Sequence, residues 1–313
     1  MNSRVLEFLV ALIASMTVTA QADMAVNAQP SASLRVSGES FVANLWLPPS
    51  KGPHAGVLLL GGSGGGIEWQ DYWGDILARH GFVALALAYF GMEGLPKELD
   101  EIPLEYFLGA IEYMQRTPAI DGNRIGVVGV SRGGELALLL ASHSPAIDAV
   151  VAFVPSAVVF QSVVSTATGQ TPRSSWTFRG RPLAFVVYEP GDTAEPLVNK
   201  FRRALAQRDQ VSNATIPVER IRGPILLLSG KEDTTWPSSD MSEMVIARLR
   251  NRKFRFSYEH IAYDHAGHMI HQIRADAVKR GGTQIGNSVA QQDAQRRTLE
   301  FLARTLTSGK RDR

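Results

Sequence analysis

The chain has 313 residues, of which 45% are hydrophobic, and its 32 Lys and Arg against 30 Asp and Glu leave a formal net charge of +2. This length and composition predict a globular protein with a large buried core. Because the charges nearly balance and the sequence has no sustained basic face, nucleic acid is not an expected partner. Cysteine is absent, which excludes disulfides, thiolate metal sites and a cysteine nucleophile.

The first residues have the pattern of a secretory signal peptide. Arg4 precedes the apolar stretch FLVALIASM, which is too short to span a bilayer, and the following TAQA ends in the A-x-A pattern that suits signal peptidase. We therefore expect residues 1–22 to be removed and residues 23–32 to form a flexible leader. The mature protein would then be periplasmic or secreted, with no membrane association. An uncleaved N-terminal helix on a cytoplasmic protein is the alternative.

The remaining residues, 33–313, predict a single α/β domain. Eight short apolar runs indicate strands, and helical stretches separate most of the later ones, a pattern typical of a mostly parallel sheet with helices on both faces. The expected strands are SLRVS, FVANLWL, AGVLLL, FVALALA, IGVVG, DAVVAFV, PILLLS and FRFSYEH. The helical stretches include YWGDILARH, LEYFLGAIEYMQ and MSEMVIARLRN. Residues 155–223 separate the sixth and seventh strands and predict a lid insertion.

A serine lies where the fifth strand meets a helix, in the segment IGVVGVSRGGELALLLAS. Ser131 is the centre of a GxSxG pattern, which is a weak signal by itself. Its context strengthens the signal, because a buried strand precedes it and a leucine-rich helix follows. In such a sharp turn, Gly129 and Gly133 remove the side chains that would clash. This predicts that Ser131 is a nucleophile, and a serine at a crowded core junction is the alternative.

An acid and a base follow the next two strands beyond the insertion. Asp233 comes directly after the seventh strand and His268 after the eighth. The order Ser, Asp, His, with the nucleophile on a strand-to-helix turn, is that of the α/β-hydrolase fold. We expect His268 to take the proton of Ser131 and Asp233 to orient the imidazole. Glu232 is an alternative acid, and His265 is the alternative base.

The glycine-rich run GGSGGG at residues 61–66 follows the third strand. Such a turn can cradle a phosphate. However, no register of the run gives GxGxxG, and no Lys-Ser or Lys-Thr pair follows it. The α/β-hydrolase fold draws its second oxyanion donor from this position. We therefore expect the backbone N–H of Ser63 or Gly64, together with that of Arg132, to bind the developing oxyanion.

The insertion carries aromatic residues suited to an acyl pocket. Trp176 and Phe178 are the candidate substrate-binding residues, and a plain surface insertion is the alternative. The histidines between residues 260 and 271 also allow a metal cluster to be considered. Their spacing is not that of HExxH and no cysteine joins them, so neither a metal nor a cofactor is expected.

Several segments together carry a family signature, namely GVSRGGE around Ser131, the downstream IPVER, and the D-x-x-W of Asp233 to Trp236. With AYFGMEGLPKELDEIPLEYF and GGTQIGNSVAQQDAQRRTLEFL, the similar segments cover most of residues 54–304. They resemble the C-terminal hydrolase domain of acyl-CoA thioesterases and bile acid-CoA:amino acid N-acyltransferases. The resemblance places Ser131, Asp233 and His268 on the family's catalytic triad.

The resemblance also implies the reaction class. Family members with serine as the nucleophile are generally thioester hydrolases, whereas the amino-acid-conjugating branch uses cysteine. We expect a serine hydrolase of acyl thioesters or related carboxylic esters, with no partner other than this small-molecule substrate. A dienelactone-hydrolase-like or general carboxylesterase is one alternative, and a non-catalytic acyl-ligand binding protein is another. CoA phosphates would need cations, for which Arg132, Arg179, Arg181 and Lys231 are candidates.

Overall fold

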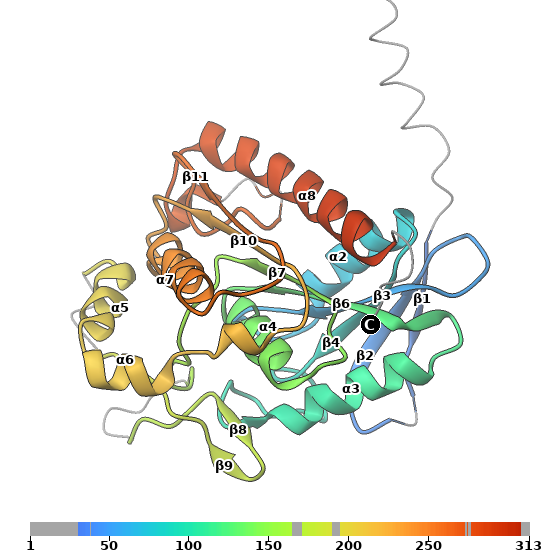
Figure 1. The fold of residues 1–313 in the computed structure, drawn as a ribbon, viewed down its shortest axis with the longest axis horizontal. Coiled ribbons are helices and arrows are strands. Elements are labelled where there is room, and N and C mark those ends of the chain that lie inside the picture. The colour runs from blue at the N-terminus through green and yellow to red at the C-terminus, as the bar shows by residue number, and fades with distance from the viewer. Residues whose placement is uncertain are drawn as a thin grey trace, which may run out of the picture.

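The centre of the molecule is a twisted sheet of eight strands (Figure 1). The structure, a computed structural model, describes residues 31–37, 39–164, 171–189, 195–272, 274 and 277–307, so the expected signal peptide lies outside the described residues. The strand order is β1-β2-β4-β3-β6-β7-β10-β11. The strands are β1 (Ala32–Arg35), β2 (Val42–Leu47), β3 (His54–Leu60), β4 (Val83–Ala88), β6 (Ile120–Val130), β7 (Ala149–Phe153), β10 (Ile225–Gly230) and β11 (Tyr258–Tyr263).

Only the β1–β2 and β2–β4 pairs are antiparallel, and the other five are parallel. The expectation of an eight-stranded, mostly parallel sheet is therefore confirmed. Parallel pairing from β3 to β11 brings the carboxyl ends of these strands to one edge of the sheet. The loops after β3, β6, β10 and β11 consequently meet there, which is the usual place for a site in this type of sheet.

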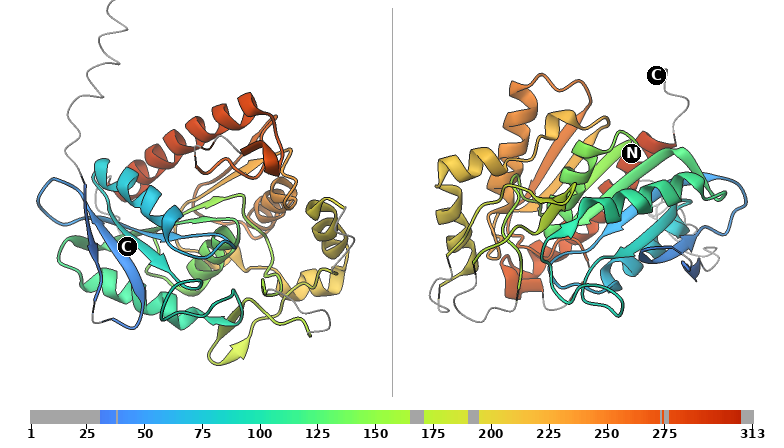
Figure 2. Two further views of the ribbon diagram at one scale, coloured as in Figure 1. Left: turned by 180° about the vertical axis from the view of Figure 1, so that it is seen from behind. Right: turned by 90° about the horizontal axis from the view of Figure 1, so that it is seen from below.

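Helices cover both faces of the sheet, as expected (Figures 1 and 2). On one face lie α3 (Leu104–Arg116), α4 (Arg132–His143) and α7 (Ser238–Asn251), and on the other lie α2 (Glu68–Arg79) and α8 (Gln284–Leu306). Because both faces are covered, β4, β7 and β10 are buried along their whole length. No helix in the described part of the chain has both the length and the apolar character to cross a membrane.

The insertion between β7 and β10 is fastened to the main domain. It contains β8 (Trp176–Phe178), β9 (Arg181–Pro182), α5 (Leu197–Leu205), α6 (Arg208–Ala214) and the 3₁₀ helix η1 (Val218–Arg220). Strand β8 pairs in parallel with β5 (Ile102–Pro103), immediately before α3, and forms a small second sheet with β9. In Figure 1 this small sheet lies beside the start of α3, and α5 and α6 lie at the left of the view, beyond α7.

The eighth strand begins later than the sequence predicts. The apolar run FRFSYEH indicated residues 254–260, whereas β11 is Tyr258–Tyr263. The end of α7 explains the difference, because the Phe254 N–H donates to the Leu249 carbonyl at 3.0 Å and Lys253 has a φ of +52°. Phe254 therefore belongs to the turn that closes the helix, and the strand begins after it.

Candidate active site

Ser131 lies in a strained turn between β6 and α4. Its φ of 56° and ψ of −117° are rarely adopted by a residue with a side chain. The flanking glycines make the turn possible, since a Cβ atom on Gly129 would lie 2.0 Å from the Gly133 carbonyl oxygen, and one on Gly133 would lie 2.1 Å from the Leu60 carbonyl oxygen. The side chain of Ser131 is thus held at the carboxyl edge of the sheet, at the N-terminus of α4.

Asp233 and His268 form a buried pair at the same edge. The Nδ1 atom of His268 lies 2.8 Å from Oδ2 of Asp233. The carboxylate accepts three further hydrogen bonds, from the Ser238 hydroxyl at 2.7 Å and from the backbone N–H groups of Thr235 at 2.8 Å and Trp236 at 3.2 Å. Bonds of this kind stabilise an ionised carboxylate and orient it toward the imidazole.

His265, the alternative base, is placed differently. Its side chain is exposed, and its Nδ1 atom lies 3.1 Å from an oxygen of Glu232, the alternative acid. Its φ of 55° belongs to the turn that leads toward His268. The structure therefore separates two acid–histidine pairs, one buried and one at the surface. Asp233 pairs with His268, and the buried pair is the one at the strand ends near Ser131.

His271 is buried, its ring packs against that of His268, and its imidazole is neutral. The indole N–H of Trp69 donates to its Nδ1 at 2.9 Å, and the indole N–H of Trp73 donates to its carbonyl oxygen at 2.8 Å. Burial lowers the pKa of His271 well below its ordinary value, and the nearby His268 adds to this effect. Across the described residues, the His, Asp and Glu side chains form no cluster suited to a metal ion.

Trp236 connects the turn of Ser131 to the histidine. The Ser131 N–H donates to the carbonyl of Phe153 at 2.9 Å, and the carbonyl of the next residue, Val154, accepts the indole N–H of Trp236 at 3.0 Å. The Trp236 ring packs edge-on against the ring of His268, with 6.2 Å between centroids. Ser131 and His268 are therefore held by one rigid core, although their side chains form no hydrogen bond in this structure.

The glycine-rich loop after β3 lies beside Ser131 at Gly62. A Cβ atom on Gly62 would lie 3.3 Å from Cβ and 3.9 Å from Oγ of Ser131. The Tyr89 hydroxyl holds this loop by donating to the Gly61 carbonyl at 2.6 Å. The loop is thus beside the nucleophile where the oxyanion donors were expected. The specific donors, the N–H groups of Ser63 or Gly64 and of Arg132, stay a prediction.

The side chain of Arg132 has a structural function that the sequence did not reveal. Its guanidinium is buried, donates to Glu135 at 2.7 Å, and reaches the insertion, where it donates to the carbonyl of Gln161 at 2.9 Å and to the Ser175 hydroxyl. Burial raises the pKa of Glu135 to about 7, an effect that Arg132 opposes. The Arg132 side chain is therefore not an accessible cation for CoA phosphates, contrary to that expectation.

The proposed pocket residues Trp176 and Phe178 lie in β8. Trp176 is completely buried, donates its indole N–H to Glu135 at 2.7 Å and packs against Phe107. Phe178 is half-buried and packs against His143, with 5.0 Å between ring centroids. Trp176 thus helps to anchor the insertion. An acyl-binding role for either residue stays a prediction.

The segment before α8 ties the loops of Asp233 and His268 together. The Arg280 carbonyl accepts the N–H of His268 at 3.0 Å, and Gly281 is bridged to Asp233. A Cβ atom on Gly281 would lie 1.9 Å from the Glu232 carbonyl oxygen, so only glycine fits there. The sequence marked this region, GGTQIGN, only as part of the family resemblance. The pair of glycines before a helix is a signal of close backbone approach that was not used to predict this contact.

Solved structures with the same architecture show that the chain has the α/β-hydrolase fold. A putative dienelactone hydrolase from Klebsiella pneumoniae superposes with a TM-score of 0.57 at 18% identity, covering 87% of this chain and 98% of that one. A dienelactone hydrolase-like promiscuous phosphotriesterase from metagenomic libraries gives a TM-score of 0.59 at 13% identity, covering 88% and 99%. At these identities the likeness establishes the fold.

The sequence comparisons identify the family. The family described as BAAT / Acyl-CoA thioester hydrolase C terminal matches residues 102–308, and the chain belongs to it. The peroxisomal succinyl-coenzyme A thioesterase of Mus musculus is 31% identical over 278 residues, covering 85% of this chain and 63% of that protein. Acyl-coenzyme A thioesterase 1 of Homo sapiens is 31% identical over 280 residues, covering 84% and 62%. The chain thus spans less than two thirds of the length of these relatives.

Proposed function

We propose that this protein hydrolyses acyl thioesters through an acyl-enzyme formed on Ser131. The observation that carries the proposal is the buried Asp233–His268 hydrogen bond of 2.8 Å at the same sheet edge as the strained turn of Ser131. A serine, a histidine and an orienting acid are the groups that acyl transfer needs. The names of the relatives, which are acyl-CoA and succinyl-CoA thioesterases, support a thioester as the bond that is cleaved.

The proposed reaction has two halves. In the first, the Ser131 hydroxyl attacks the acyl carbonyl while Nε2 of His268 takes its proton, and the backbone N–H groups of Ser63 or Gly64 and of Arg132 donate to the oxyanion. The tetrahedral intermediate expels the thiolate, which receives the proton from His268. In the second half, water attacks the ester of Ser131 with His268 again as the base. The carboxylic acid leaves and the serine hydroxyl is restored.

Asp233 sets the tautomer of the histidine in this scheme. Because Nδ1 of His268 faces Oδ2 of Asp233, its proton belongs on Nδ1, and Nε2 keeps the lone pair that accepts from Ser131. The Ser131–His268 hydrogen bond forms when substrate is bound, since such contacts commonly tighten only in the complex. The three further donors to Asp233 fix the position of its carboxylate, which faces the imidazolium that forms and stabilises it.

The leaving group is the less determined half of the substrate. Of the candidate cations, Arg132 is buried against Glu135 and Lys231 lies 2.8 Å from Asp264. Arg179 and Arg181, at the exposed turn between β8 and β9, are the ones left for a phosphate-bearing thiol. We therefore propose the acyl carbonyl as the primary recognition element, with CoA and smaller thiols both accepted.

A fluorophosphonate probe and a matched substrate panel test this proposal. We expect the probe to label one serine, and Ser131→Ala to abolish both labelling and turnover while the far-ultraviolet circular dichroism is unchanged. Rates on acyl-CoAs should exceed those on p-nitrophenyl esters of the same acyl groups. Faster cleavage of the esters would instead favour a general carboxylesterase. Absence of labelling would favour the non-catalytic binding protein.

We also propose that the protein is exported and that its mature chain begins near Asp23. The support is the A-x-A pattern that ends at Ala22, after the apolar stretch. An exported enzyme is separated from the cytoplasmic CoA pool, so its natural substrate would be another thioester or ester. N-terminal sequencing of protein recovered from a bacterial periplasm tests export. Rates on an acyl-CoA and on the same acyl group joined to a small thiol test the leaving group. Uncleaved protein that strongly prefers CoA would contradict both statements.

A further inference from the structure

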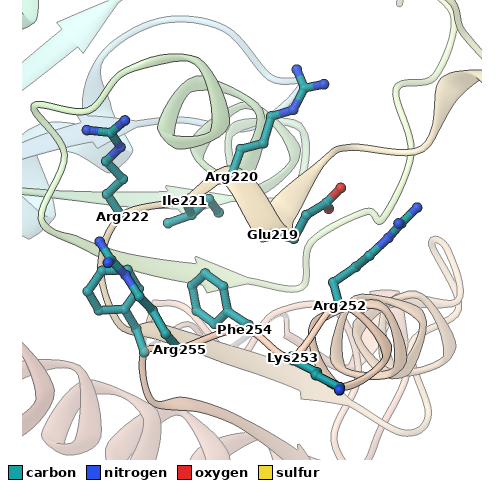
Figure 3. Close-up of a pocket in the computed structure, with 9 residues that line it drawn as sticks. Glu219, Arg220, Ile221, Arg222, Arg252, Lys253, Phe254 and Arg255 are labelled. Atoms are coloured by element: carbon teal, nitrogen blue, oxygen red, sulfur yellow. The ribbon is translucent and has the colours of Figure 1, made fainter.

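A basic pocket of about 300 Å³ lies outside the candidate active site (Figure 3). Its walls come from η1 with the residues after it, and from the turn between α7 and β11. Its lining residues are Glu219, Arg220, Ile221, Arg222, Arg252, Lys253, Phe254, Arg255 and Phe256. Five of these nine are cations, in a chain whose formal net charge is only +2. Such a local excess of one charge attracts ions of the opposite sign.

The five cations form no close ion pair with the described acids, although Arg252 is near enough to Glu219 to help lower the pKa of that carboxyl. All five are exposed, and none forms an ion pair within 4.0 Å. Glu219 is the one acid of the lining, and both of its oxygens are occupied by Arg248, at 2.6 and 2.7 Å. Arg248 holds the pKa of Glu219 below its ordinary value, so this carboxylate is charged but already neutralised.

Two of the arginines lie on one side of the pocket. Figure 3 shows Arg222 and Arg255 there, beside Ile221 and Phe254, while the head groups of Arg220, Arg252 and Lys253 point outward around it. Arg255 is also held in place, since its guanidinium carbon lies 4.7 Å from the centroid of the Phe256 ring. Arg222 and Arg255 therefore stand beside an apolar floor, and the other three cations add positive charge around it.

The pocket and Ser131 lie at opposite edges of the sheet. Its lining residues directly precede β10 and β11, whereas Asp233 and His268 directly follow these strands. The two sites are thus at opposite edges of the sheet, separated by the length of β10. Six residues of strand span about 17 Å at roughly 3.3 Å per residue. The pocket is therefore distinct from the candidate active site.

We propose that this pocket binds a small soluble anion with two or more phosphate groups. Guanidinium groups bind phosphate oxygens in a bidentate manner, and four of the five cations are arginines. One phosphate group neutralises at most two of the five charges, whereas a di- or triphosphate matches most of them. The small volume admits a compact group of this kind, and a folded protein segment is too large for it.

Titration calorimetry with sodium triphosphate at constant ionic strength tests the inference. We expect one binding site per chain and a dissociation constant at least about tenfold higher for Arg222→Glu/Arg255→Glu. Lys51→Glu/Lys97→Glu is the control, because it makes the same change in net charge at exposed lysines elsewhere. This control should bind within about twofold of the parent. If circular dichroism shows that the Arg222→Glu/Arg255→Glu variant is unfolded, the single variants Arg222→Gln and Arg255→Gln are used in its place.

Three results would overturn the inference. One is triphosphate binding that the two double variants weaken equally, since it would then depend on net charge alone. Another is no measurable heat with millimolar triphosphate. The third is binding to phosphatidylglycerol vesicles or to a hexaglutamate peptide that is tighter than binding to triphosphate and is lost in the Arg222→Glu/Arg255→Glu variant. The surface would then recognise a membrane or an acidic protein. Rates on thioesters should be equal in all variants, which keeps this test independent of the proposed hydrolase activity.

Discussion

Nδ1 of His268 lies 2.8 Å from Oδ2 of Asp233, although the two residues are 35 positions apart in the chain. The parallel pairing of β10 and β11 produces this contact, because both residues follow the carboxyl ends of neighbouring strands. The contact is buried and the carboxylate is fully hydrogen bonded, so the imidazole has one orientation. In the proposed mechanism this orientation presents Nε2 to Ser131.

The two histidines in the same loop provide a direct comparison. We expect His268→Ala to lower kcat by at least about 10³-fold, because it removes the proposed base. His265→Ala removes an exposed side chain paired with Glu232 and should leave kcat within about twofold. Steady-state rates on one acyl thioester measure both. A large loss of kcat in His265→Ala, together with a nearly unchanged kcat in His268→Ala, would make His265 the base instead.

Gly281 tests whether the segment before α8 positions the acid and the base. A Cβ atom there would lie 1.9 Å from the Glu232 carbonyl, and the φ of Gly281 is +95°. Gly281→Ala should lower both the free energy of unfolding and kcat, by more than the roughly 1 kcal/mol that positive φ alone costs. Gly180→Ala is the matched control, since Gly180 has a φ of +69° but no atom within 4 Å of the added methyl. Equal losses of stability in both variants would contradict the proposed clash.

The buried pair of Arg132 and Glu135 should be worth far more than a surface pair. Arg132→Met or Glu135→Gln leaves one partner buried without its counterpart, which costs about 3–5 kcal/mol of unfolding free energy. The double variant Arg132→Met/Glu135→Leu should lose less than the sum of the single losses, because neither charge is then left alone. Glu112→Gln, in an exposed pair with Arg116, is the control and should cost under about 1 kcal/mol. Additive losses in denaturant unfolding would show that the two side chains act independently.

The neutral state of His271 predicts a loss of stability in acid. Its pKa in the folded protein is depressed, so between pH 6.5 and 5 the unfolded chain binds a proton there that the folded chain does not. The free energy of unfolding should therefore fall as the pH drops below about 6.5, by at most about 2 kcal/mol at pH 5. His271→Asn keeps an acceptor for the Trp69 N–H but cannot be protonated. Parallel stability curves for the variant and the parent would refute this.

Phe178 tests the acyl-pocket prediction with little disturbance of the core. It is half-buried, whereas Trp176 is completely buried and bonded to Glu135, so truncating Trp176 would confuse binding with folding. If Phe178 lines the pocket, Phe178→Ala should weaken the discrimination between successive chain lengths, where each buried CH₂ is worth up to about 0.8 kcal/mol. Rates on a series of straight-chain acyl thioesters measure this. An unchanged series would make the segment a surface insertion.

The sequence alone determined most of the sheet and the turn of the nucleophile. The central strands, such as β4, β7 and β10, could be predicted because a parallel sheet with both faces covered requires continuous apolar runs. The turn of Ser131 could be predicted because its constraint is local, since Gly129 and Gly133 leave out atoms that would collide within a few residues. The family signature, confirmed by the match over residues 102–308, points to the same positions.

Only the tertiary structure decided the contacts between distant segments. Asp233 pairs with His268 instead of His265 because of where β11 ends and how the backbone turns at positive φ after it. The burial of Arg132 against Glu135 could not be predicted from the sequence. A charged pair three residues apart is usually exposed on a helix. The insertion that covers this pair lies more than 20 residues away in the chain. The basic pocket likewise joins η1 and the end of α7 through strand pairing. Such contacts depend on the register and packing of whole elements, which no local pattern of residues encodes.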